Sequence, residues 1–249
     1  MRILLWLRFD GRRYCGWQVQ PNGVSVQSLV QDALERVLGV RPNVSGCSRT
    51  DAGVGALQYA CHFDCDKAFV WAKLPEALNF YLPEDVAATA AQEVEEDFHA
   101  RYSCRAKQYV YRFQQGHICD PFWEERVYRS YRPLDVERMN EAAAHLLGTH
   151  DFSAFESAGA SVEDKVRTLT YCRLTCEQDG TVALRIRGDG FLYNMVRIIA
   201  GTLLEVSNGK LQPQDIPALL EGKDRSRCGP TLPAKGLLLE QVIYGEDAR

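Results

Sequence analysis

GCSRTDAGVGAL, residues 46–57, is a loop bounded by glycines that lies between two segments with the pattern of β-strands. A short strand is expected near residues 43–48, and alternating apolar and polar residues predict a longer strand over residues 57–65. Loops of this kind present functional side chains on a rigid scaffold. The triplet RTD, residues 49–51, is therefore the first candidate for a functional site.

The segments on either side of this loop extend the pattern. A buried strand is expected over residues 2–9, and Ser25 is the expected N-cap of an amphipathic helix that Gly39 ends. After the loop, a helix is expected over residues 71–81 and a strand over residues 86–94. The predicted order is strand, helix, strand, strand, helix, strand.

The second half of the chain repeats this order. The elements expected there are a strand over residues 104–114, a helix over residues 135–147 ended by Gly148, strands over residues 167–176 and 181–187, a helix over residues 194–206 and a strand over residues 237–244. Two tandem split βαβ units are the ferredoxin-like or RNA-recognition-like architecture. The sequence thus predicts an α+β fold whose N-terminal half, residues 1–100, and C-terminal half, residues 101–249, form one extended, mainly antiparallel sheet with a central cleft. Extra helical residues are expected at 213–220, and residues 148–164 are expected to be an irregular lid or rim.

The composition is that of an ordinary globular protein. Of 249 residues, 46% are hydrophobic and 25% charged, which suffices for a sizeable core. No apolar run is long enough to span a bilayer, and the opening segment is interrupted by Arg2 and Arg8. No small-residue cleavage site follows it, so a signal peptide is not expected. The sequence predicts a cytoplasmic protein without a membrane segment.

The nine cysteines are expected to be reduced thiols, because an odd number is spread over a long chain without a secretory signal. A zinc site is the alternative for Cys61, His62 and Cys65, together with Cys172 and Cys176. Neither cluster has the CxxC spacing of a zinc knuckle, and alternating strand positions facing the core explain the first one. No metal is predicted.

Charge is unevenly distributed along the chain. Lys and Arg total 29 against 33 Asp and Glu, and the net charge of −4 argues weakly against a nucleic-acid partner. Residues 99–113 (HARYSCRAKQYVYRF), however, carry basic side chains and no acid, directly after an acidic run at residues 93–97. A local basic stripe of this kind can bind phosphate whatever the total charge.

The loop at residues 46–57 closely resembles the GRTDAGVHA signature of the TruA pseudouridine synthases. Other family blocks follow in order: FDGRRYCGWQ at residues 9–18, SVQ at 25–27, FHARYSCRAKQYVY at 98–111, GFLYNMVR at 190–197 and PAKGLLL at 233–239. The resemblance covers nearly the whole chain and implies the pseudouridine synthase fold. Without it, the spacing alone favours a structural role for Asp51, which could brace the turn.

The resemblance implies a tRNA pseudouridine synthase that isomerises uridine to pseudouridine in the anticodon stem-loop, at positions 38, 39 and 40. This isomerisation breaks the bond from N1 to C1′ and rejoins the base through C5 without net redox change, so no metal or organic cofactor is required. Asp51 is implied as the catalytic carboxylate, which either adds to an electrophilic carbon or removes a sugar proton. Either role requires the ionised form.

Three residues of the second half match family positions at the site. Arg197 matches the arginine that pairs with the catalytic aspartate, where a guanidinium favours and orients the charged carboxylate. The alternative is a solvated arginine on the helix, which the apolar neighbours of Arg197 make less favourable. Tyr109 matches the tyrosine whose ring lies against the everted base, with a core tyrosine as the alternative. Leu237 is expected to form the apolar wall beside that ring.

The resemblance extends to residues that would contact RNA. Arg49 resembles the family residue that occupies or holds open the space left by the flipped base, and a solvated loop arginine is the alternative. Gly55 stands where the family usually has His. We interpret this position as one that contacts RNA or structures the loop, so the change is expected to affect substrate affinity more than the chemical step. The expected phosphate contacts are Arg12, Arg13, Arg101, Arg105 and Lys107.

The partners implied are tRNA and a second copy of the chain, in a homodimer whose subunits both touch one tRNA. Two other classes of function are left open. A catalytically silent RNA-binding or tRNA-chaperone paralogue is supported only by Gly55, and the retention of Asp51, Arg197 and Tyr109 argues against it. A tandem ferredoxin-like small-molecule or metal-binding protein would hold metal on the strand of Cys61.

Overall fold

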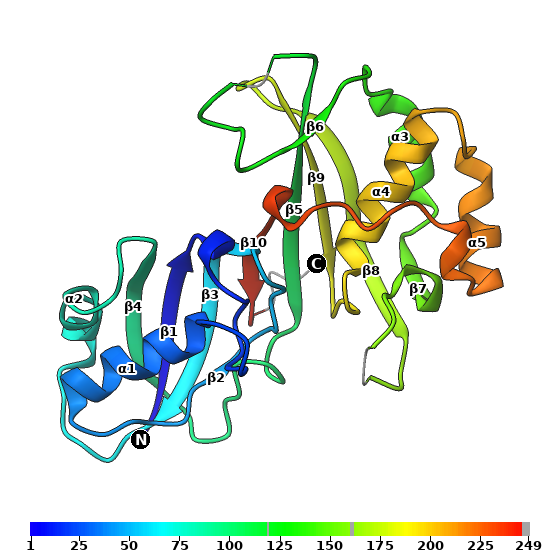
Figure 1. The fold of residues 1–249 in the computed structure, drawn as a ribbon. Helices are drawn as coiled ribbons and strands as arrows, with labels where there is room; N and C mark the ends of the chain where they lie inside the picture. The colour runs from blue at the N-terminus through cyan, green and yellow to red at the C-terminus, as the bar shows by residue number, and fades with distance from the viewer. Residues whose placement is uncertain (119, 160–161, 246–249) are drawn as a thin grey trace. The chain divides into compact units, whose positions relative to one another are not determined.

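The computed structural model describes residues 1–118, 120–159 and 162–245, which form helices and mainly antiparallel strands (Figure 1). The chain divides into two compact units: unit 1 contains residues 1–105 and the C-terminal strand from Leu238, and unit 2 contains residues 106–237. The predicted α+β class is confirmed. Within the described ranges, no helix combines the length and the apolar character that crossing a membrane requires.

Unit 1 is a mixed sheet with two helices. Its strands are β1 (Arg2–Phe9), β2 (Ser45–Gly46), β3 (Gly55–Asp64), β4 (Val86–Val94) and β10 (Leu237–Ile243), its helices α1 (Val26–Leu38) and α2 (Leu74–Asn79), and its 3-10 turns η1 (Gly11–Arg13) and η2 (Trp71–Lys73). The strand order is β4-β1-β3-β10. β1 is antiparallel to both β3 and β4, β2 is antiparallel to β3, and β10 runs parallel to β3 with Leu238 opposite Gly55.

Helix α1 begins and ends where the sequence predicts. The Ser25 hydroxyl accepts the backbone N–H of Ser28 at 3.1 Å, and Gly39 ends the helix in the left-handed conformation, with φ of 68°. The apolar residues at helical spacing, among them Val30 and Leu34, are fully buried. The periodicity of the sequence therefore identifies this helix correctly.

Two other expected elements of unit 1 are shorter in the structure. The helix expected over residues 71–81 starts as the 3-10 turn η2 and becomes α-helical only at Leu74, with Pro75 in its first turn. The strand expected near residues 43–48 is reduced to the two residues of β2. Both differences concern boundaries, which local patterns define least well.

Unit 2 contains mainly antiparallel strands and three helices. Its strands are β5 (Ala106–Gln115), β6 (Tyr128–Ser130), β7 (Gly148–Asp151), β8 (Val166–Cys176) and β9 (Thr181–Gly188), its helices α3 (Val136–Ala144), α4 (Met195–Ser207) and α5 (Ile216–Gly222), and its 3-10 turns η3 (Ser153–Phe155), η4 (Pro213–Asp215), η5 (Arg225–Arg227) and η6 (Ala234–Gly236). The strand order is β5-β9-β8-β7, with β6 added in parallel to β5. Helix α3 packs against α4 and β8 (Figure 1).

The prediction for the residues around Gly148 was wrong. Helix α3 ends at Ala144, and Gly148, at φ of 96°, begins strand β7 instead of ending the helix. β7 pairs with β8 through Gly148 and Leu169. The segment expected to be irregular therefore contains a strand, followed by the 3-10 turn η3. Its last part includes residues 160–161, which lie outside the described residues.

Helix α4 is buried on nearly all sides, and a glycine lets an extended segment cross it closely. A β-carbon on Gly201 would lie 1.9 Å from the carbonyl oxygen of Pro230, so no larger residue fits there. Thr202 strengthens the crossing, because its hydroxyl accepts the backbone N–H of Gly229 at 3.0 Å. The helix thereby fixes the course of residues 229–233, which include the Leu232 carbonyl that accepts a hydrogen bond from Arg197.

Candidate functional site

The loop between β2 and β3 carries Asp51, whose side chain is half-buried in unit 1. Backbone hydrogen bonds tie the loop to a distant segment: Trp17 N–H donates to the Thr50 carbonyl at 3.3 Å, and Gly53 N–H donates to the Tyr14 carbonyl at 3.2 Å. Tyr14 and Trp17 belong to the FDGRRYCGWQ block. Residues more than thirty positions apart in sequence, from two motifs, therefore form one structure around Asp51.

Glycines allow the close approach of these two segments. Gly16 has φ of 103°, and a β-carbon there would lie 2.4 Å from the Thr50 carbonyl oxygen. A β-carbon on Gly11 would lie 1.9 Å from the Val54 carbonyl oxygen. Glycine is thus required at both positions because a β-carbon would overlap the backbone of the loop.

An aromatic cluster supports the same loop from the core. The rings of Trp17 and Tyr59 lie 4.3 Å apart, and Phe9 lies 5.4 Å from Tyr59. The Tyr59 hydroxyl donates to the Ser48 carbonyl. Sequence reasoning did not single out Tyr59, although its position in the alternating strand marks it as core. The loop is therefore connected to the buried aromatic core of unit 1.

The neighbours of Asp51 in the loop differ in burial. Arg49 is exposed and makes no hydrogen bond or ion pair with the described residues. Thr50 is only 7% exposed, and its hydroxyl has no hydrogen-bond partner in the described part of the chain. A buried hydroxyl without a partner is costly, and such groups are often found at functional positions.

Gly55 is a packing position in this chain. It is buried at the start of β3, and a β-carbon there would lie 2.8 Å from Cδ2 of Leu238 and 2.9 Å from the carbonyl oxygen of Phe9. A side chain there would require both the Leu238 side chain and the β1 backbone at Phe9 to shift. The geometry favours the loop-structuring interpretation of this position over direct contact with RNA.

The turn η1 places two predicted RNA contacts beside the Asp51 loop. Arg12 forms an ion pair with Asp10 at 2.7 Å. Arg13 lies 3.3 Å from Asp85 with its side chain 79% exposed, so its ion pair is largely screened by solvent. Asp85 also accepts a hydrogen bond from Tyr14, which helps to raise the pKa of that phenol together with burial, the larger cause.

The remaining basic candidates differ in accessibility. Arg101 and Arg105 are exposed, and the Arg101 guanidinium lies 5.6 Å from the centre of the exposed Tyr102 ring. Lys107 lies opposite Gly188 in the β5–β9 pair and is only 8% exposed. Arg101 and Arg105 therefore have the accessibility that a phosphate contact needs, while Lys107 has less of it.

In unit 2, Arg197 lies in the first turn of α4, where it is half-buried. Its Nε donates to the Leu232 carbonyl at 2.7 Å, and its Nη1 donates to Oδ1 of Asn194 at 2.5 Å. The first contact depends on the segment that crosses α4 at Gly201. Arg197 is therefore an oriented group, which excludes the alternative of a freely solvated helix arginine.

Two tyrosines of β5 have distinct environments. Tyr109 is 6% exposed, and its ring meets that of Phe191 edge to face at 5.0 Å. Tyr111 is fully buried, donates to the Pro233 carbonyl at 2.9 Å, and has a raised pKa because of burial. It anchors the turn that precedes Leu237, which is 5% exposed. Tyr111 is therefore a tyrosine of the core.

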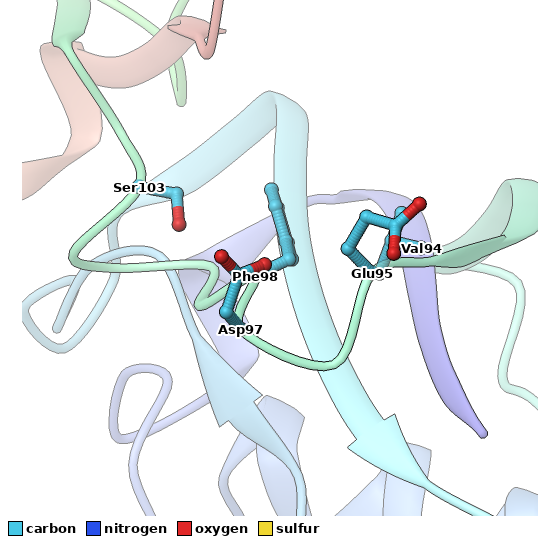
Figure 2. A pocket seen from close by; sticks show the side chains of 5 residues that line it. All are labelled: Val94, Glu95, Asp97, Phe98 and Ser103. Carbon is cyan, nitrogen blue, oxygen red and sulfur yellow. The ribbon is translucent and has the colours of Figure 1, made fainter.

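The structure also contains a surface pocket that the sequence did not predict. It has a volume of about 410 Å³ and is lined by residues of the segment that leads out of β4, namely Val94, Glu95, Asp97, Phe98 and Ser103 (Figure 2). Arg2 holds this segment by donating to the Phe98 carbonyl at 2.9 Å. None of the predicted site residues lines the pocket.

No group of three or more His, Cys, Asp or Glu side chains has a metal-binding arrangement in residues 1–118, 120–159 and 162–245. Cys61 and Cys172 are buried thiols, and burial raises the pKa of both, that of Cys172 to about 12. A metal ligand must be the thiolate, which this burial disfavours.

The predicted site residues fall in both units. Asp51 and Arg49 belong to unit 1 with Arg12, Arg13, Arg101 and Arg105, whereas Arg197, Tyr109, Lys107 and Leu237 belong to unit 2. The partnership of Asp51 with Arg197 stays a prediction. Sequence reasoning missed Asn194 and Leu232, although Asn194 lies inside the GFLYNMVR block.

A family model described as tRNA pseudouridine synthase matches residues 142–245. A protein named tRNA pseudouridine synthase A from Shouchella clausii is 46% identical over 252 residues, covering 98% of this chain and 94% of that protein. Proteins of the same name from Clostridium acetobutylicum and Myxococcus xanthus are each 42% identical, the first covering 97% of this chain and 99% of its own, the second 98% and 92%. The similarity therefore extends through both units.

Proposed function

This chain belongs to the tRNA pseudouridine synthase A family, and we propose that it isomerises uridine to pseudouridine at positions 38, 39 and 40 of the tRNA anticodon stem-loop. The observation that carries the proposal is the Arg49–Asp51 loop. It presents a half-buried carboxylate on a backbone that Tyr14 and Trp17 fix by hydrogen bonds. A catalytic group needs such a rigid support, because small displacements cost large factors in rate.

The reaction is an isomerisation that this chain's own side chains suffice to support. The bond from C1′ to N1 breaks, a bond from C1′ to C5 forms, the hydrogen on C5 is lost to solvent, and N1 gains a proton. Atoms and electrons balance without an oxidant or reductant, so the proposal includes no cofactor and no metal. Asp51 acts as the nucleophile or as the base that removes a sugar proton, and both roles require the carboxylate.

Unit 2 supplies the other proposed catalytic groups. By the family resemblance, Arg197 is the cation that pairs with Asp51, Tyr109 is the aromatic group against the everted base, and Leu237 is the apolar wall beside it. The hydrogen bonds from Arg197 to Asn194 and Leu232 support this role, because an arginine that must orient a carboxylate needs a fixed plane. The burial of Tyr109 and Leu237 supports a site from which water is excluded.

The substrate is tRNA, and its binding is the proposed role of the basic residues. Arg49 would occupy or hold open the space left by the flipped base. The proposed phosphate contacts are Arg12, Arg13, Arg101, Arg105 and Lys107. We also propose that the protein is a cytoplasmic homodimer. In this proposal residues 1–100 form the half that carries the Asp51 loop, and residues 101–249 form the half that completes the cleft.

A catalytically silent RNA-binding paralogue is the second candidate considered, and its only support was Gly55. The packing of Gly55 against Leu238 and Phe9 explains that residue without any loss of catalytic function. The isomerase is therefore the function that the residues support best.

The test uses the purified full chain, without added cofactor, and a tRNA transcript labelled with tritium at C5 of uridine. Pseudouridine formation releases the label, so the parent protein is expected to release tritium, and Asp51→Ala is expected to abolish release while retaining tRNA binding. Asp66→Ala is the matched control, because Asp66 is fully exposed and pairs only weakly with the N-terminus. Release by Asp51→Ala at the parent rate would falsify the assignment of Asp51.

A further inference from the structure

The residue that precedes α4 makes contacts which its usual role does not explain. Asn194 is the N-cap residue of α4, a position where Asn commonly accepts a backbone N–H of the first turn. Here its side chain makes no capping hydrogen bond. Its Oδ1 accepts from Nη1 of Arg197 at 2.5 Å, and its Nδ2 donates to the Ser157 hydroxyl at 2.9 Å. The amide is thus used to hold Arg197, and Ser157 holds the amide.

The backbone of Asn194 enables this use of the side chain. Its φ of 61° and ψ of 8° lie in the left-handed region, which Asn adopts more readily than most residues. A second backbone contact holds the neighbouring segment, because Ser157 N–H donates to the Tyr193 carbonyl at 3.1 Å. The unusual backbone and the two side-chain hydrogen bonds form one connected arrangement.

Two fixed acceptors determine the orientation of the Arg197 guanidinium. The Leu232 carbonyl accepts from Nε and the Asn194 amide accepts from Nη1, so two different nitrogens of one planar group are held. Rotation about the last side-chain bonds would break at least one of these hydrogen bonds. The plane of the guanidinium is therefore set before a substrate arrives.

The chemical type of the acceptor is equally informative. An amide oxygen and a carbonyl oxygen are neutral, so they orient the guanidinium without neutralising its charge. An Asp at position 194 would accept the same hydrogen bond, but it would form an ion pair with Arg197. Neither of these two acceptors therefore neutralises the charge that Arg197 is proposed to direct at the catalytic carboxylate.

We propose that Asn194 is a positioning residue for the isomerase reaction: its neutral amide, held by Ser157, fixes the plane of the Arg197 guanidinium and leaves its charge for the catalytic carboxylate. This inference rests on the proposed role of Arg197. It assigns to Asn194 a function that acts through Arg197, with no contact to the substrate.

Two substitutions separate the backbone and side-chain roles of Asn194. Asn194→Gly keeps the left-handed backbone and removes the amide, while Asn194→Asp keeps the acceptor and adds a negative charge. Asn208→Ala is the matched control, because Asn208 follows the other end of α4 and has an ordinary helical φ of −77°. For each variant, the single-turnover rate of tritium release from C5-labelled tRNA is measured between pH 5 and 9, with tRNA affinity and thermal unfolding measured alongside.

Asn194→Gly is expected to lower the single-turnover rate about tenfold or more, with tRNA affinity within about twofold of the parent. Asn194→Asp is expected to move the acidic limb of the rate profile upward by about one pH unit, because a partly neutralised Arg197 lowers the pKa of the catalytic carboxylate less. Asn208→Ala is expected to match the parent. A purely structural role would not shift the profile.

Parent rates and an unshifted acidic limb in both Asn194 variants would overturn the inference, and so would rate losses that only follow the unfolded fraction. Arg197→Ala distinguishes this failure from failure of the proposed function. If Arg197→Ala is inactive while both Asn194 variants behave as the parent, the function stands and the role of Asn194 is wrong. If the parent protein releases no tritium, the proposed function fails and the inference with it.

Discussion

Gly16 lies directly against the carbonyl of Thr50: a β-carbon at Gly16 would come within 2.4 Å of that oxygen, and its φ of 103° is itself unfavourable for other residues. The next residue, Trp17, donates its N–H to the same carbonyl at 3.3 Å. The GWQ segment therefore determines where the peptide before Asp51 lies. A glycine 35 positions away in sequence is part of the support of the proposed catalytic carboxylate.

Replacement of Gly16 is expected to displace the Asp51 loop. Gly16→Ala must relieve both a steric overlap and an unfavourable φ, and we expect it to lower the free energy of unfolding by about 1–3 kcal/mol and the rate of tritium release by at least about tenfold. Urea unfolding and the tritium assay measure the two effects. Gly23→Ala is the control, because its β-carbon would meet Cys15 at an ordinary distance of 3.5 Å. Equal activity of the two variants would show that the loop does not depend on Gly16.

Gly55 leads to a prediction about stability. Gly55→Ala is expected to lower the free energy of unfolding by about 1–3 kcal/mol, since the added carbon overlaps Leu238 and the Phe9 carbonyl. Leu238→Ala in the same chain should recover part of that loss, with a coupling energy of about 1 kcal/mol in a double-mutant cycle. Restoring the family residue through Gly55→His should destabilise this chain as well. Strictly additive losses in the cycle would contradict the packing argument.

Much of this architecture could be predicted from local patterns. Helix α1 was recognisable from its apolar spacing, with Ser25 and Gly39 at its ends. The strands expected over residues 57–65, 167–176 and 181–187 match β3, β8 and β9 to within two residues at each end. β7 could not be predicted in this way. It has four residues, of which two are exposed and none fully buried, so its sequence carries no hydrophobic signal. Its pairing with β8 is a tertiary effect.

Pairing partners and side-chain networks were also beyond local patterns. The parallel pairing of β10 with β3 joins Leu238 to Gly55 across more than 180 residues, and no turn signal encodes it. The Arg49–Asp51 loop was identifiable from its motif, but its attachment to Tyr14 and Trp17 was not. The sequence includes Asn194 in the expected helix over residues 194–206, and no local pattern indicates that its amide contacts Arg197.

The proposed phosphate contacts predict a change in salt dependence. Arg101→Gln and Arg105→Gln should each weaken tRNA binding and reduce the slope of log affinity against log salt by about 0.7 to 0.9, the value for one lost phosphate contact. Filter binding of an inactive Asp51→Ala background between about 50 and 200 mM salt measures this slope. Arg41→Gln is the control, because Arg41 already pairs with Asp32 and Glu35.

Lys107 gives a stricter test of the same basic stripe. Its 8% exposure means that an RNA phosphate must reach a largely covered side chain. If Lys107 is a phosphate contact, Lys107→Gln must reduce the slope as much as Arg105→Gln does. A slope equal to that of the parent would remove Lys107 from the interface while leaving Arg101 and Arg105 in it.

His62 predicts how stability depends on pH. Its ring is 5% exposed, and Nδ1 accepts the backbone N–H of Ala100 at 3.1 Å, a hydrogen bond that a protonated ring cannot accept. Burial lowers the pKa of His62 from 6.5 to about 4, with help from His99 and Arg2, while Asp64 opposes the shift. The imidazole ring of His99 lies 4.6 Å away, and its own pKa is lowered, mainly by burial. Burial thus favours the neutral form of both rings in the folded protein.

The sign of the effect follows from proton binding. Between pH 4 and 6.5 the unfolded chain binds a proton at His62 that the folded chain does not. The contribution of His62 to the free energy of unfolding is therefore fully present above pH 6.5 and is lost as the pH falls towards 4. Part of the charge would be screened by solvent, and we expect His62 to contribute up to about 2 kcal/mol of this loss.

His62→Gln keeps an acceptor for the Ala100 N–H without titrating, so urea unfolding of this variant at pH 7, 5.5 and 4.5 should show a shallower decline. His145→Gln, which changes an exposed histidine, should decline as the parent does. Parallel curves for parent and His62→Gln would mean that the segment around Ala100 adapts to a charged ring, and the acid sensitivity would then have to come from other groups.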